Sequence, residues 1–141
     1  MTTMLPNQTL ITGLRSNEAA DDRSQFAGTS GMDPERQARW REIVDMLLRW
    51  LDDPRSCIDE DYDPPTQAAI RAALRRASHG LKGSMVVPTR VAPIGDGGVV
   101  FEWQFEPTFI EVEIEGTGAS ELRSFLGGKL IELIPLGAPE P

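Results

Sequence analysis

Residues 99–115 read Val-Val-Phe-Glu-Trp-Gln-Phe-Glu-Pro-Thr-Phe-Ile-Glu-Val-Glu-Ile-Glu, and this stretch decides the fold. Apolar and polar side chains alternate on both sides of Pro107, which is the period of a strand with one buried face and one solvated face. We therefore expect a β-hairpin with Pro107-Thr108 as its two-residue turn. The predicted core face carries Val99, Phe101, Trp103, Phe105, Ile110, Val112 and Ile114.

The other face of this hairpin is rich in glutamate. A turn at Pro107-Thr108 pairs Trp103 with Val112 and sets Glu102 directly opposite Glu113. Like charges in that position destabilise a sheet, so a solvated face and a docking face for a basic partner are both open interpretations. The candidate partner-binding residues are Glu102, Glu111, Glu113 and Glu115.

Further strand signals flank the hairpin. A short run ending at Pro93 precedes it, and the turn-forming residues Gly95-Asp96-Gly97-Gly98 lie between the two. Runs at 121–126 and 129–134 follow and are separated by Gly127-Gly128. Asp-Gly and Gly-Gly between apolar runs are typical of hairpins. The pattern predicts an antiparallel meander of four or five strands.

Two amphipathic helices come first in the chain. Asp33-Pro34 begins the first, over 34–51, and apolar residues recur from Trp40 to Leu51 at helical spacing. The second, over 65–79, is rich in alanine; we expect Asp63 to cap it and Gly80 to end it. The predicted fold class is α+β, with two N-terminal helices packed on one face of the four- to five-stranded meander.

The expected organisation is one domain over 33–135, between a disordered tail at 1–32 and a short C-terminal tail at 136–141. The first fifteen residues lack the features of a secretory signal, and no apolar run reaches the roughly 20 residues of a membrane-spanning helix. Cys57 is the only cysteine. A single thiol suits a reducing compartment, so we expect a cytoplasmic protein that does not contact a membrane.

Charge argues against a nucleic-acid partner. The chain carries a net charge of −8, and residues 84–141 hold three basic and nine acidic side chains. Phosphate backbones would be repelled by that part of the chain. Weak nucleic-acid binding through Arg71, Arg75 and Arg76 on the second helix stays open as an alternative.

Other candidate sites have simpler interpretations. Asp59, Asp61 and Asp63 alternate as in a calcium loop, but Pro64 stands where such a loop needs glycine, so a solvated loop is expected. Cys57 and His79 would have to be in contact to form a nucleophilic pair. One cysteine and one histidine also cannot supply the four ligands of a closed zinc site. The glycine cluster lies between strands, unlike a phosphate-binding loop. We expect no metal, no cofactor and no catalytic residue.

The order of these signals resembles a group of small bacterial α+β proteins without an established activity. The shared features are Asp52-Asp53-Pro54 after the first helix, Pro64-Pro65-Thr66 before the second, a proline-flanked strand, and Asp96-Gly97-Gly98 leading to Glu102-Trp103. The likeness covers roughly residues 40–134. It implies that this chain has an antitoxin-like role and assigns no functional residue.

The leading hypothesis is therefore a non-catalytic protein-interaction or regulatory module, antitoxin-like, that uses its acidic sheet face to bind a basic protein. One rival is a small hydrolase that uses paired carboxylates, either Glu102 with Glu113 or the 59–63 loop. A depression lined by Glu102, Glu113 and an aromatic residue would favour the hydrolase. An open acidic face would favour docking.

Overall fold

The computed structural model describes residues 33–83 and 85–137, and these fall into two compact units. The smaller unit holds 33–39 and 80–86, apart from residue 84, and the larger holds 40–79 and 87–137. The tail expected at 1–32 lies outside the described residues. The helices are α3 (Pro34–Asp52), the short 3-10 helix η1 (Pro54–Cys57) and α4 (Gln67–Lys82). The strands are β1 (Arg90–Pro93), β2 (Val99–Phe105), β3 (Thr108–Ile114), β4 (Ser120–Leu126) and β5 (Lys129–Gly137).

The smaller unit contains the first turns of α3 and the last turn of α4. Asp33 caps α3 as expected, because its Oδ2 accepts a hydrogen bond from the backbone N–H of Arg36 at 3.3 Å. The predicted end of the second helix at Gly80 is wrong. Gly80 is buried inside α4, which continues to Lys82. A glycine at that position ends a helix only where the chain turns away, and here the chain continues helically.

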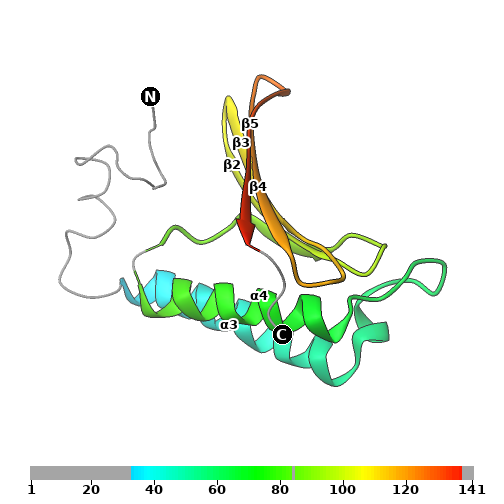
Figure 1. The fold of residues 1–141 in the computed structure, drawn as a ribbon. Helices are drawn as coiled ribbons and strands as arrows, with labels where there is room; N and C mark the ends of the chain where they lie inside the picture. The colour runs from blue at the N-terminus through cyan, green and yellow to red at the C-terminus, as the bar shows by residue number, and fades with distance from the viewer. Residues whose placement is uncertain (1–32, 84, 138–141) are drawn as a thin grey trace. The chain divides into compact units, whose positions relative to one another are not determined.

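The larger unit contains a five-stranded antiparallel sheet in the order β1-β2-β3-β4-β5, which is the meander that the sequence predicts (Figure 1). β5 runs to Gly137 and so includes two residues from the segment expected as a C-terminal tail. Gly97 adopts a φ of 100° in the β1–β2 turn. A Cβ on Gly98 would lie 2.4 Å from the carbonyl oxygen of Ile114, so this turn requires glycine for close approach as well as for backbone conformation.

One face of the sheet is buried in this unit, and the helices pack on it. Trp103, Val112 and Ile114 are each at most 8% exposed, which confirms the predicted core face. The helices contribute the buried residues Trp40, Leu47, Trp50, Ala69, Ile70, Ala73 and Ala77. The fold class is therefore α+β, with both helices preceding the sheet.

Two positions depart from the predicted alternation. Val100 belongs to the outward set but is 4% exposed, and its cross-strand partner Ala92, on the same side of the sheet, is buried as well. Phe105 belongs to the core set but is 48% exposed. It is the last residue of β2, at the end of the strand farthest from the β1–β2 turn.

Thr66 holds the start of α4 against the sheet. Its hydroxyl oxygen accepts a hydrogen bond from the N–H of Ala69 at 3.0 Å and its hydroxyl donates to the carbonyl of Gly116 at 2.6 Å. Its own N–H donates to the carbonyl of Gly97 at 3.0 Å. Thr66 is therefore the cap of α4, and the prediction that Asp63 caps this helix is wrong. The backbone of Asp63 instead bonds to the β1–β2 turn, where its N–H donates to Gly95.

Candidate functional site

The glutamate-bearing side of the sheet differs from expectation in its register. Glu102 lies opposite Glu111, and Glu113 lies opposite Val100, so the predicted Glu102–Glu113 pairing is wrong. The reason is the turn, which consists of Glu106-Pro107 and places Phe105 opposite Thr108. The pairing moves by an even number of residues, so every side chain stays on its predicted face.

We define the acidic sheet face as Glu102, Glu111, Glu113, Glu115 and Glu121 together with Arg90 and Arg123. At its β1 side, Nη1 of Arg90 lies 3.0 Å from Oε1 of Glu102. Arg90 retains 61% of its side-chain exposure, whereas Glu102 retains 20%. This ion pair therefore reaches into solvent, where it is worth little in stability.

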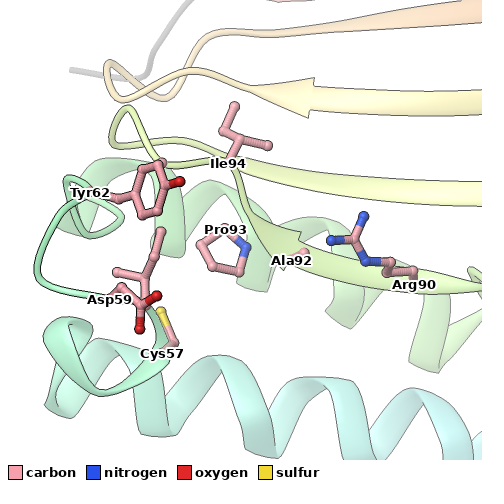
Figure 2. A pocket seen from close by; sticks show the side chains of 9 residues that line it. Cys57, Asp59, Tyr62, Arg90, Ala92, Pro93 and Ile94 are labelled. Atoms are coloured by element: carbon pink, nitrogen blue, oxygen red, sulfur yellow. The ribbon is translucent and has the colours of Figure 1, made fainter.

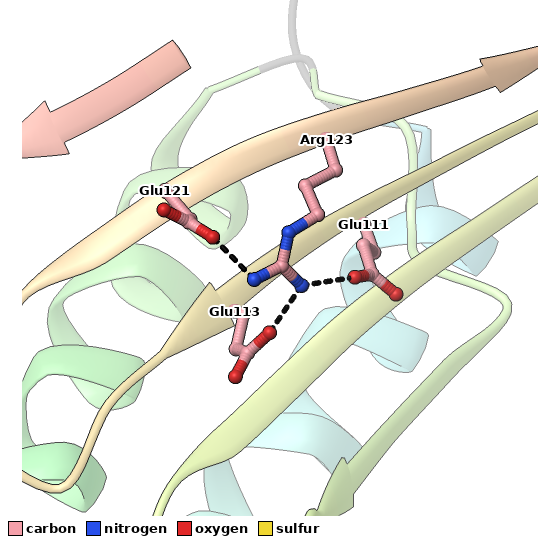
Figure 3. A network of polar contacts seen from close by, with 4 residues as sticks. All are labelled: Glu111, Glu113, Glu121 and Arg123. Carbon is pink, nitrogen blue, oxygen red and sulfur yellow. Dashed lines mark hydrogen bonds and ion pairs between the residues drawn. The ribbon is translucent and has the colours of Figure 1, made fainter. Parts of the chain in front are cut away.

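At its centre, three carboxylates share the guanidinium of Arg123 (Figure 3). Nη1 lies 2.7 Å from Oε2 of Glu111 and also bonds to Oε1 of Glu113, while Nη2 bonds to Oε2 of Glu121. Hydrogen bonds to Glu111 and then to Glu113 raise the pKa of Arg123 above its usual value, against a smaller opposing effect of burial. Arg123 bridges Glu113 and Glu121, which lie directly opposite each other in the register.

Two of these four residues, Glu111 and Glu113, are among the candidate partner-binding residues that the sequence predicted. Glu121 was not identified as a site residue. Alternation along β4 places Glu121 and Arg123 on one side of that strand, and the β3–β4 register shows that it is the side of Glu111 and Glu113. Glu115 is exposed and lies one residue beyond β3.

The acidic sheet face remains negatively charged after these pairings. Five carboxylates stand against two guanidinium groups, which leaves a net charge of −3 on one side of the sheet. The two arginines fix the positions of four of the five carboxylates. The arrangement can therefore present an ordered negative potential to a basic surface.

The acidic loop between η1 and α4 is held by Arg55. Its Nη1 donates hydrogen bonds to the backbone carbonyls of Asp59, at 2.7 Å, and Tyr62, at 2.9 Å. Within residues 33–83 and 85–137, no group of three or more acidic, cysteine or histidine side chains is arranged to hold a metal ion. The loop carboxylates of Asp59 and Asp61 are exposed.

A shallow depression of about 430 Å³ lies between this loop and β1 (Figure 2). Tyr62, Asp59 and Cys57 lie at one end of it and Arg90 at the other, with Ala92 and Pro93 between them. Neither Glu102 nor Glu113 lines it. The Glu102–Glu113 pair of the hydrolase hypothesis therefore does not lie at this depression, whereas Asp59 of the 59–63 loop does.

Cys57 and His79 do not have the features of a catalytic pair. Burial raises the pKa of the Cys57 thiol, a change that a backbone hydrogen bond and Arg55 oppose. The thiol donates to the carbonyl of Pro54 at 3.3 Å, within its own 3-10 helix. A raised pKa keeps the thiol protonated and weakens it as a nucleophile. His79 is exposed on α4.

The arginines of α4 do not form one exposed basic stripe. Arg71 and Arg75 are exposed, but Arg76 is only partly accessible, and burial lowers its pKa. Nη2 of Arg71 lies 3.5 Å from Oε1 of Gln67. Nucleic-acid binding through these three side chains therefore has less support than the sequence pattern alone suggested.

None of the described helices combines the length and apolar character that crossing a membrane requires. In comparisons with known proteins, no family model matches the chain, and no curated protein or solved structure matches it either.

Proposed function

We propose that this protein is a non-catalytic protein-interaction module that binds a basic partner through the acidic sheet face. The observation that carries the proposal is the net charge of −3 that remains on this face after Arg90 and Arg123 are paired. Fixed negative potential accelerates the encounter with a basic surface and selects against acidic ones.

Docking has more support than hydrolysis. Glu102 and Glu113 are not opposite each other, and each is bound to a different arginine. A general acid and its partner carboxylate must both reach a substrate in one cleft. The depression beside β1 contains neither of them.

A regulatory, antitoxin-like role is the form of this function that the resemblance implies. In that role the acidic sheet face would cover a basic functional surface on its partner. We place the protein in the cytoplasm, because its single thiol, Cys57, suits a reducing compartment.

The test uses an oligolysine peptide as the basic probe and two variants matched in charge. Glu113→Gln/Glu115→Gln removes two charges from the acidic sheet face, and Glu42→Gln/Asp45→Asn removes two exposed charges from α3. We expect the face variant to bind the peptide about fivefold more weakly at low salt and the α3 variant to match the wild type within about twofold. Equal losses in both variants would mean that binding follows net charge alone, and would overturn the proposal.

A further inference from the structure

The outward side of the sheet also carries apolar side chains, next to its carboxylates. The β3–β4 register sets Phe109 opposite Phe125. The β4–β5 register sets Phe125 opposite Leu130 and Arg123 opposite Leu133. Residues directly opposite each other in a ladder share one side of the sheet, so all of these lie on the side of Arg123 and the glutamates. We define the apolar corner as Phe109, Phe125, Leu130 and Leu133.

The apolar corner is open to solvent. Leu130 is 48% exposed and Leu133 is 49% exposed, while Phe109 and Phe125 are partly exposed. The two phenylalanine rings have their centroids 5.8 Å apart and their planes tilted by 50°, an arrangement that stabilises aromatic pairs. Among the described residues β5 is the last strand of the sheet, so no further strand borders the two leucines. The corner therefore presents an ordered aromatic pair beside two accessible leucines.

The corner directly adjoins the charged centre of the acidic sheet face. Phe109 and Phe125 form one cross-strand row, and Glu111 and Arg123 form the next row on the same side. Such rows lie about 7 Å apart, because side chains on one side of a strand recur every second residue. Leu133 extends the second row beyond Arg123. Apolar and acidic groups are thus close enough to contact the same bound segment.

The two sets of groups call for different chemistry in one partner. Lysine or arginine side chains suit the net charge of −3 on the acidic sheet face, and apolar side chains suit the corner beside it. A basic amphipathic helix carries both, as an apolar stripe flanked by basic residues. A helix with its side chains is about 10 Å wide, and neighbouring strands are about 4.8 Å apart, so one helix covers two to three strands. An extended segment laid along the strands is narrower and reaches fewer of these groups.

We propose that the acidic sheet face and the apolar corner together bind one basic amphipathic helix of the partner. This inference rests on the proposed function and deepens it by specifying the form of the partner. The apolar stripe of the helix packs on the corner, and its flanking lysines or arginines face Glu102, Glu111 and Glu113. Packing of the stripe removes water from beside the carboxylates, which strengthens their attraction to the basic side chains.

Two helix-forming peptides of equal charge test the inference on the full chain by fluorescence anisotropy. The leucine peptide has lysines beside a stripe of leucines, and in the alanine peptide every leucine is replaced by alanine, which keeps the charge and the helix propensity. We expect the leucine peptide to bind about tenfold more tightly. High salt should weaken both peptides while the ratio of their affinities persists, because salt screens charges and does not weaken apolar contacts.

A matched pair of variants locates the apolar contact. Leu133→Ser alters the corner, whereas Leu126→Ser alters a side chain that is 48% exposed on the other side of the sheet, the side of Val112. We expect Leu133→Ser to weaken the leucine peptide about fivefold and to leave the alanine peptide unchanged. Leu126→Ser should change neither affinity. Leu130→Ser, at an equally exposed position of the corner, serves if Leu133→Ser does not fold.

The proposed function and this inference fail through different results. Glu113→Gln/Glu115→Gln should weaken both peptides; if it weakens neither, the proposed function fails and this inference fails with it. If that variant weakens both peptides but the wild type binds them equally, only the role of the apolar corner is overturned. The same holds if Leu126→Ser weakens the leucine peptide as much as Leu133→Ser does, or if neither corner variant weakens it.

Discussion

Replacing Arg123 with methionine should destabilise the fold, because Glu111, Glu113 and Glu121 then lose the guanidinium that they share. The three ion pairs are cross-strand or near neighbours on a half-buried face, and each is worth ~0.2–1 kcal/mol. Glu113 and Glu121 are directly opposite, so their repulsion adds a term of similar size. The sum gives a loss of about 2 kcal/mol in the free energy of unfolding.

Urea denaturation followed by tryptophan fluorescence measures this loss at neutral pH. The difference between the variant and the wild type should shrink at high salt, which screens the uncompensated carboxylates. Methionine keeps most of the aliphatic packing of arginine, so the measured difference reports the charge.

Arg90→Met is the matched control. Its ion pair with Glu102 is largely exposed on the arginine side, so its loss should cost no more than ~0.5 kcal/mol. The reasoning is refuted if Arg123→Met is as stable as the wild type, or if the two arginine variants lose the same amount.

Three further predictions concern the fold and the thiol. Trp103→Ala should cost ~3–5 kcal/mol in the same urea assay, because Trp103 is 8% exposed, and a loss below ~1 kcal/mol would show that the core face is loosely packed. Thr66→Val should cost ~1–3 kcal/mol, since it removes both the cap of α4 and the bond to Gly116. Thr117→Val removes a single bond, from the N–H of Ala119 at 3.3 Å, and should cost less than ~1 kcal/mol; equal losses would contradict the role of Thr66. Cys57 should react with a thiol reagent at a higher pH than a free cysteine peptide does, because burial raises its pKa. The pKa of Cys57 is higher in the folded than in the unfolded chain. The thiol therefore contributes stability that is fully present below the unfolded pKa of about 8.5 and is lost as the pH rises through the folded pKa. Faster reaction than the peptide at neutral pH would contradict this.

The sequence predicted the faces of the hairpin but not its register, and one physical reason explains both. Alternation fixes which side of a strand each side chain occupies, and a turn at Pro107-Thr108 or at Glu106-Pro107 gives the same two faces. The choice between them decides which glutamates meet. Trp103 was therefore correctly predicted as buried, while Glu102 was assigned the wrong partner.

Local patterns also failed where contacts distant in sequence decide the outcome. Asp63 and Thr66 are both good capping residues, and only the bonds from Thr66 to Gly97 and Gly116 distinguish them. The group around Arg123 depends on the pairing of β3 with β4, which brings Glu111 and Glu121 within reach of one guanidinium. No periodicity within a single strand contains that information.

Affinity capture from the source cell, compared across three forms of the protein, tests the interaction function most directly. The forms are the wild type, Glu113→Gln/Glu115→Gln on the acidic sheet face, and Glu42→Gln/Asp45→Asn on α3, with captured proteins measured by quantitative mass spectrometry. We expect at least one basic protein to be captured by the wild type and the α3 variant and to be depleted from the face variant. A set of captured proteins that is the same for all three forms would contradict the claim that the acidic sheet face binds a partner.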